Sequence, residues 1–183
     1  GAGDEGLFDW FAAALTGLGP KASNVILYHI PQVTSVGLSM DLIGQLKKAF
    51  PKQVAGVKDS SGDWDNAQAL LKHHGELHIL IGDERLLAKA MTLGASGAIT
   101  GLANIAPDLM KSLIDGIEEP RINAMVEAVL PYAVTAAVKA LVGHRRKDPV
   151  AWSRMRAPLK SLGEADCIKL FAAIDAIRAK RAA

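Results

Sequence analysis

The sequence predicts an α/β fold, because four short apolar stretches alternate with segments of helical character. The predicted strands, rich in β-branched and other apolar residues, cover about 24–31, 54–61, 77–83 and 96–102. Brief connections and a helix after each strand are typical of a parallel sheet covered by helices.

Helices are expected around these strands over 4–19, 39–50, 63–74, 84–94 and 106–116. Asp4 and Ser39 are the predicted N-caps of the first two helices, since their side-chain oxygens can accept from free amides. Gly19 and Gly94 follow helical segments as terminating glycines do, and Pro107 suits a first helical turn.

After Gly116 the pattern is helical only, with helices predicted over 120–142, 149–156 and 164–180. The first of these is expected to kink near Pro131. We therefore expect two regions, a βα region over 1–116 and an appended C-terminal helical segment over 117–183.

Composition excludes several function classes. The 183 residues are half hydrophobic and carry a formal net charge of only +2, which gives little support to nucleic-acid binding. The apolar stretch 122–142 contains Glu127 and Lys139, and charges at that depth disfavour a membrane span.

The single cysteine, Cys167, allows no internal disulfide and suits a cytoplasmic location. The chain begins with Gly1 rather than methionine, which fits either a tag remnant or a cut made inside a longer protein.

Side-chain alternation places one lysine in an unusual position. In 54–58, Val57 points to one face and Lys58 to the other. If Val57 packs beneath helices, Lys58 faces the opposite side near the carboxyl end of its strand. Tyr28 is placed in the same way on its own strand, whereas His29 points away. In an eight-stranded (β/α)₈ barrel, the interior at the carboxyl ends of the strands carries the chemistry.

A complete barrel of this type takes about 250 residues and eight strands. Four βα units would leave two open edges and an uncovered apolar inner face. The sequence therefore predicts the second half of a (β/α)₈ TIM barrel followed by C-terminal helices, with the N-terminal half-barrel missing.

Lys58 is a candidate nucleophile. Burial in an apolar wall favours a neutral amine, which can attack a ketone and form a Schiff base that stabilises an adjacent carbanion. Tyr28 could relay protons beside it. The structural alternatives are a Lys58 that reaches solvent or pairs with Asp59 or Asp83, and a Tyr28 that only packs.

Glycines at strand ends, Gly82, Gly97 and Gly101, allow close approach of a ligand or of a packed helix. They could hold a carboxylate or a phosphate, which leaves a phosphate-binding half-barrel as a further hypothesis. The sequence has no metal-ligand spacing, P-loop, dinucleotide fingerprint or nucleophile elbow, so no metal or organic cofactor is expected.

Three stretches together carry a resemblance to a known family: "ILYHIPQVTSVGLS", "VAGVKDSSGD" and "ILIGDERLLAKAMTLGASGAITGLANIAPDLM". Their order and spacing resemble the dihydrodipicolinate synthase and N-acetylneuraminate lyase family, and "RAPLKSLGEAD" is similar to its C-terminal helices. The resemblance implies a (β/α)₈ barrel, commonly tetrameric, that forms a Schiff base with pyruvate or another 2-oxo acid.

The resemblance also assigns residues. It implies Lys58 as the Schiff-base lysine and Tyr28 as the proton-relaying tyrosine. Substrate contacts are implied for three further positions: Ser60, Gly82 and Ile99.

Departures from the family pattern narrow the expected activity. The Gly-Thr-Thr-Gly-Glu type motif that holds the 2-oxo acid carboxylate is absent, and Val33 stands where dihydrodipicolinate synthases usually carry arginine. The residues after Gly82 also differ from those usual in sialic acid lyases. We expect a class I aldolase, lyase or dehydratase acting on a 2-oxo acid. The alternative is a fragment that is inactive without an N-terminal partner chain.

Overall fold

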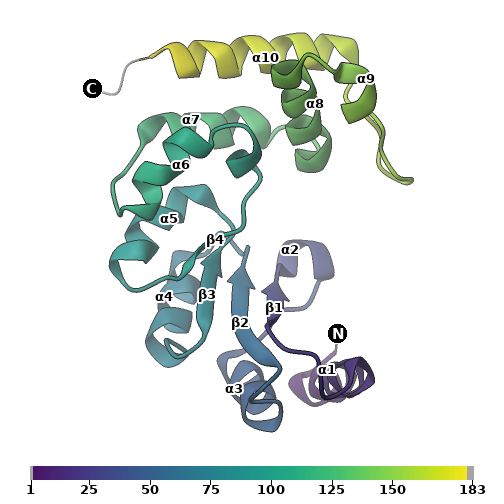
Figure 1. Ribbon diagram of the computed structural model, residues 1–183, viewed down its shortest axis with the longest axis vertical. Coiled ribbons are helices and arrows are strands. Elements are labelled where there is room, and N and C mark those ends of the chain that lie inside the picture. Colours follow the sequence, from purple (N-terminus) through teal and green to yellow (C-terminus); the bar gives the residue numbers. More distant parts are fainter. Residues whose placement is uncertain (1, 181–183) are drawn as a thin grey trace. The chain divides into compact units, whose positions relative to one another are not determined.

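The computed structural model describes residues 2–180, which form two compact units dividing after Ile99. The first unit is an α/β arrangement (Figure 1). Its elements are α1 (Asp4–Leu18), β1 (Val25–His29), α2 (Pro31–Thr34), α3 (Met40–Ala49), β2 (Val54–Asp59), α4 (Trp64–His73), β3 (His78–Ile81), α5 (Glu84–Thr92) and β4 (Gly97–Ala98).

The four strands form one parallel sheet in the order β1-β2-β3-β4, as a series of βα units requires. One row of register partners runs across it: Tyr28, Lys58, Leu80 and Gly97. The predicted α/β class with a parallel sheet is therefore confirmed. All four strands lie inside their expected ranges and are shorter, and β4 has only two residues.

The two faces of the sheet differ in burial. Leu27, Val57 and Ile79 are at most 2% exposed, on the face where β2 and β3 contact α3, α4 and α5. Tyr28 and Lys58 have the opposite parity, and Tyr28 is 46% exposed. The predicted alternation is thus confirmed at both strands.

Individual residues at the helix ends explain where α1 and α3 begin and where α1 ends. Ser39 caps α3 as predicted, because its hydroxyl accepts from the amide of Leu42 at 3.0 Å. The prediction for Asp4 was wrong: Gly3 is the N-cap of α1, and the Asp4 carboxylate instead accepts a hydrogen bond from Ser39. Gly19 ends α1 at a φ of 77°, a conformation that glycine adopts without strain.

The second unit, which starts at Thr100, is helical. Its elements are the 3₁₀ helix η1 (Leu102–Asn104), α6 (Pro107–Ile114), α7 (Pro120–Val129), α8 (Val134–Arg146), α9 (Pro149–Trp152) and α10 (Glu164–Ala179). The expected single kinked helix over 120–142 was wrong, because α7 and α8 meet at a 115° break around Pro131. Among residues 2–180 no single helix is long and apolar enough to cross a membrane, and only the bent α7–α8 pair has the length and composition.

The packing boundary after Ile99 lies earlier in the chain than the change of pattern at Gly116. α6 follows the last strand, as in a βα unit, but it contacts η1 and α7. The apolar side chains that it buries, Leu109, Met110 and Leu113, belong to the helical unit.

Candidate functional site

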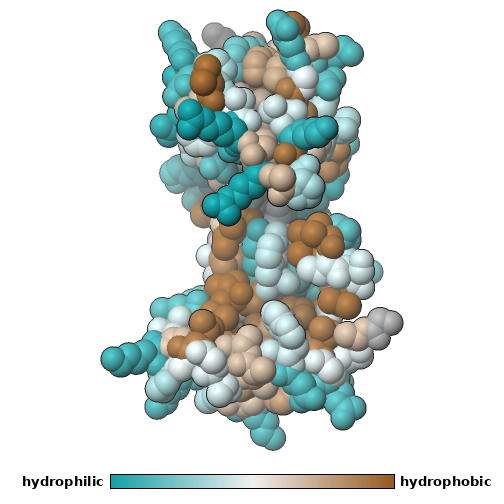
Figure 2. Space-filling model, turned by 90° about the vertical axis from the view of Figure 1, so that its right-hand side faces the viewer, coloured by the Kyte–Doolittle hydropathy of each residue, from teal (hydrophilic) through white to brown (hydrophobic). Residues whose placement is uncertain are grey.

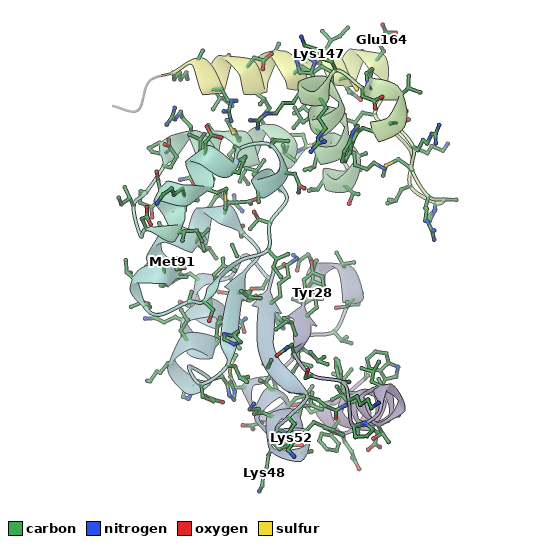
Figure 3. The ribbon with its side chains drawn as sticks, viewed as in Figure 1. Tyr28, Lys48, Lys52, Met91, Lys147 and Glu164 are labelled. Atoms are coloured by element: carbon green, nitrogen blue, oxygen red, sulfur yellow. The ribbon has the colours of Figure 1, made fainter. Side chains whose placement is uncertain are left out.

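Lys58 and Tyr28 meet on the exposed face of the sheet, near the carboxyl ends of β2 and β1. They are register partners, and the Lys58 ammonium donates to the Tyr28 hydroxyl at 3.0 Å. The same nitrogen lies 4.1 Å from the centre of the Tyr28 ring, which adds a cation–π contact. Figure 3 shows Tyr28 close to α2, and Lys48 and Lys52 at the other end of the sheet.

The parallel ladder continues one residue beyond the strands. The amide of Ser60 donates to His29 at 2.9 Å, and that of Gly82 donates to Asp59 at 2.7 Å. Because side chains alternate along an extended backbone, Ser60 shares the face of Lys58. Its hydroxyl donates to the Tyr28 oxygen at 3.5 Å, so two donors converge on one phenol.

Gly82 leaves room for Ser60. A Cβ at position 82 would lie 2.0 Å from Ser60 Oγ and 2.9 Å from the Asp59 carbonyl oxygen, both impossible contacts. The predicted substrate-contacting glycine is therefore a close-approach glycine whose neighbour is another predicted site residue.

The hydrogen bonds and the positive charge around Tyr28 determine in which direction its pKa is shifted. Burial alone raises the pKa of this phenol, but hydrogen bonds from Lys58 and Ser60 and the positive charge of Lys58 outweigh burial. The pKa of Tyr28 is consequently lowered from its ordinary value of 10.0. A phenol with a lowered pKa is better suited to accept and return protons near neutral pH.

The two carboxylates that could have paired with Lys58 are engaged elsewhere. Asp59 is buried on the other face and accepts from the Ser61 amide at 2.9 Å and from Asn66 at 3.0 Å. Asp83 accepts from Arg85, at 2.7 Å for the shortest contact, and burial opposed by this arginine leaves the pKa of Asp83 lowered. The alternative in which either residue pairs with Lys58 was therefore wrong.

His29 confirms the expected parity and has a structural role. It is buried on the helix-covered face, where Nδ1 accepts from the amide of Leu38 at 2.9 Å. This bond ties the segment after α2 to the end of β1. Among residues 2–180, no three histidine, cysteine or acidic side chains are grouped as metal ligands.

Ile99 is the residue that follows β4. Its amide donates to the carbonyl of Ile81 at 3.1 Å, and its side chain is 49% exposed. Leu80 is the register partner of Lys58 on β3 and shares its face of the sheet. Strand parity alone could have identified Leu80, which the sequence analysis missed.

An apolar groove of about 680 Å³ lies between α1 and β1, and Tyr28 lines one end of it. Trp10 is 65% exposed and Leu18 61% exposed along this groove. Figure 2 shows the side of the molecule that carries α1 and α2, with hydrophobic residues gathered over the first unit. One site residue, Tyr28, therefore borders a strongly apolar groove.

The profile of the "Dihydrodipicolinate synthetase family" matches residues 3–164. The chain belongs to this family. Most of both compact units lies within the matched range.

Individual members agree with this assignment. A protein described as an uncharacterized DapA-like lyase from Chloroflexus aurantiacus is 33% identical over 184 residues, 96% of this chain and 60% of its own length. The crystal structure of dihydrodipicolinate synthase from Agrobacterium tumefaciens is 46% identical, with a TM-score of 0.91, and the match covers 96% of this chain and 61% of that one. The chain therefore spans about 60% of the length of these relatives.

A more distant structure shares the fold alone. It is a catalytic lysine mutant of the sialic acid aldolase from Ruminococcus gnavus, 21% identical with a TM-score of 0.79, matching 97% of this chain and 61% of that one.

Proposed function

We propose that the protein carrying this chain is a class I aldolase or lyase that forms a Schiff base between Lys58 and pyruvate or a related 2-oxo acid. The observation that carries the proposal is the 3.0 Å hydrogen bond from Lys58 Nζ to Tyr28 Oη at the carboxyl end of a parallel sheet. Family membership supports it, since relatives are described as lyases and one aldolase is described as having a catalytic lysine.

Lys58 and Tyr28 together can form the Schiff base. A Tyr28 phenolate can take a proton from the Lys58 ammonium across the hydrogen bond, and the neutral amine then adds to the C2 carbonyl of the substrate. Tyr28 gives this proton to the departing hydroxyl of the adduct, so that loss of water leaves an iminium and restores the phenolate. The positive nitrogen withdraws electrons from the bond between C3 and C4.

Cleavage requires the same tyrosine again. When the C3–C4 bond breaks, its electron pair forms an enamine with the iminium carbon, and the C4 hydroxyl proton passes to the Tyr28 oxygen as an aldehyde leaves. Tyr28 then returns a proton to C3 of the enamine, and water hydrolyses the iminium to release the 2-oxo acid. Ser60 and Gly82 line this end of the sheet, and Ile99 is proposed to line the pocket directly after β4.

Val33 favours an aldehyde substrate other than that of a true dihydrodipicolinate synthase. It lies on α2, two residues beyond Pro31, and its side chain is 72% exposed and carries no charge. Without a guanidinium at this position, the site has one cation fewer with which to bind a carboxylate on the aldehyde partner. A sugar acid or other hydroxy 2-oxo acid is therefore favoured as substrate.

The function is tested by aldol cleavage. The protein is incubated with a panel of hydroxy 2-oxo acids, and released pyruvate is measured by a coupled hydride-transfer assay. We expect pyruvate from at least one substrate and none with Lys58→Arg, which keeps the charge but cannot form the Schiff base. Equal activity of Lys58→Arg and the parent would reject the proposal. Val33→Arg should shift preference toward an aldehyde partner that carries a carboxylate.

A second hypothesis about function concerns the chain alone, which is inactive until an N-terminal half-barrel completes it. The complete protein is then a cytoplasmic homo-oligomer. The exposed apolar groove beside β1 and the coverage of about 60% of the relatives favour this candidate. Size measurement with intact mass and a cleavage assay distinguishes the two. A monodisperse 183-residue monomer with turnover would contradict the second candidate.

A further inference from the structure

Gln32 makes a contact that joins α2 to the end of β2. Its side-chain amide donates to the carbonyl oxygen of Ser60 at 2.6 Å, although the two residues are 28 positions apart in sequence. Gln32 is otherwise exposed on a four-residue helix, where a glutamine usually extends into solvent. The bond therefore fixes the carbonyl of a residue that reaches the Tyr28 phenol.

The peptide groups of Ser60 are held by two hydrogen bonds. Its amide donates to His29 at 2.9 Å, and its carbonyl accepts from Gln32. Its side chain occupies the space that any side chain at position 82 would fill. The remaining direction is that of its hydroxyl, which donates to the Tyr28 oxygen.

We propose that Gln32 is a positioning residue for Tyr28, acting through Ser60. The Ser60–Tyr28 distance of 3.5 Å is at the outer limit of a hydrogen bond, so a small displacement of Ser60 abolishes it. Gln32 prevents that displacement by restraining the Ser60 peptide. The inference deepens the proposed function, because it rests on Tyr28 as the proton relay.

The other groups around Tyr28 do not take this role. Lys58 on β2 is the charged residue that contacts the phenol, and it donates directly without Gln32. Thr34, which lines the same groove, uses its hydroxyl to donate to the carbonyl of Val36 at 2.7 Å. Within residues 2–180, Ser60 is thus the group that can transmit an effect of Gln32 to the phenol.

The test uses the small number of tyrosines. Tyr28 and Tyr132 are the two tyrosines of the 183-residue chain, so Tyr132→Phe leaves Tyr28 as the one phenol whose ionisation is read by ultraviolet absorbance. In this background, Gln32→Met keeps the length of the side chain and removes the donor. Ser60→Ala, the double variant and Gln45→Met complete the set, the last as a matched change at an exposed position of α3.

We expect Gln32→Met and Ser60→Ala each to shift the Tyr28 titration midpoint upward, and the double variant to match Ser60→Ala. Gln45→Met should leave the midpoint unchanged. A midpoint unaltered by Gln32→Met, or an effect of Gln32→Met that persists fully in Ser60→Ala, would overturn the proposal. Thermal unfolding is recorded in parallel, and lost stability with an unchanged midpoint would also overturn it.

The titration requires no substrate. A failure of aldol cleavage with the expected midpoint shifts would reject the proposed function alone. Cleavage without the shifts would reject the role of Gln32 alone.

Discussion

Gly82 and Ser60 are so close that the glycine cannot carry a side chain: its Cβ would lie 2.0 Å from Ser60 Oγ. The amide of Gly82 donates to the carbonyl of Asp59, the residue before Ser60, at 2.7 Å. Two neighbouring strand ends are therefore locked together beside the Lys58–Tyr28 pair. The geometry at this point determines where the Ser60 hydroxyl lies.

Gly82→Ala should displace Ser60 and weaken the fold. Because the added methyl group also meets the Asp59 carbonyl at 2.9 Å, we expect a loss of about 1–3 kcal/mol in the free energy of unfolding. Urea denaturation measures this loss. Gly17→Ala on α1 is the control, since nothing lies within 4 Å of its Cβ position and alanine there should stabilise the helix by up to about 1 kcal/mol. Equal effects of the two substitutions would contradict the packing explanation.

Tyr28→Phe should separate the role of the phenol from that of the ring. The ring can keep its cation–π contact with Lys58, so the free energy of unfolding should change by no more than about 0.5 kcal/mol. Proton relay is lost, and kcat for aldol cleavage should fall by about 10²–10⁴-fold. Steady-state kinetics beside urea denaturation measures both effects. A Tyr28→Phe enzyme with unchanged kcat would show that the phenol does not transfer the proton.

Removal of the lysine charge should raise the pKa of Tyr28. Lys58→Met eliminates a hydrogen bond and a positive charge that both lower this pKa, and leaves the opposing effect of burial. In the Tyr132→Phe background, ultraviolet titration should therefore show a higher midpoint for Lys58→Met than for the parent. A midpoint that stays or falls would mean that Lys58 does not contact the phenol in solution.

The same pKa has a consequence for stability. An unfolded tyrosine has a pKa of about 10, and Tyr28 in the folded chain has a lower one. The fold thus favours the ionised phenol. Its contribution to stability is complete above the unfolded value and is lost as the pH falls through the folded value. Lys58→Met should remove this pH-dependent contribution.

Much of the first unit follows from local sequence. Alternation predicts that Val57 is buried and that Lys58 faces the other way, because the period of two is fixed by the strand backbone. The cap at Ser39 is equally local, since one hydroxyl and one amide three residues away determine it. The meeting of Lys58 and Tyr28 follows from strands that are sequential neighbours in a parallel sheet.

What could not be predicted depends on contacts between distant segments. Ser60, Gln32 and Gly82 come together through one side-chain bond and one steric fit, neither of which has a sequence period. The break near Pro131 is another case: proline predicts a kink, but the 115° turn depends on how α7 and α8 pack within the helical unit. Asp4 failed as a cap because its carboxylate bonds to Ser39, 35 residues away.

The site of Schiff-base formation tests the proposed role of Lys58. The protein is incubated with pyruvate and borohydride, digested and analysed by mass spectrometry, with the exposed Lys48 and Lys52 at the other end of the sheet as internal controls. We predict a reduced pyruvyl group on Lys58 of the complete protein, none on the two control lysines, and none anywhere after Lys58→Arg. An adduct on another lysine, or no adduct in the active protein, would contradict this prediction.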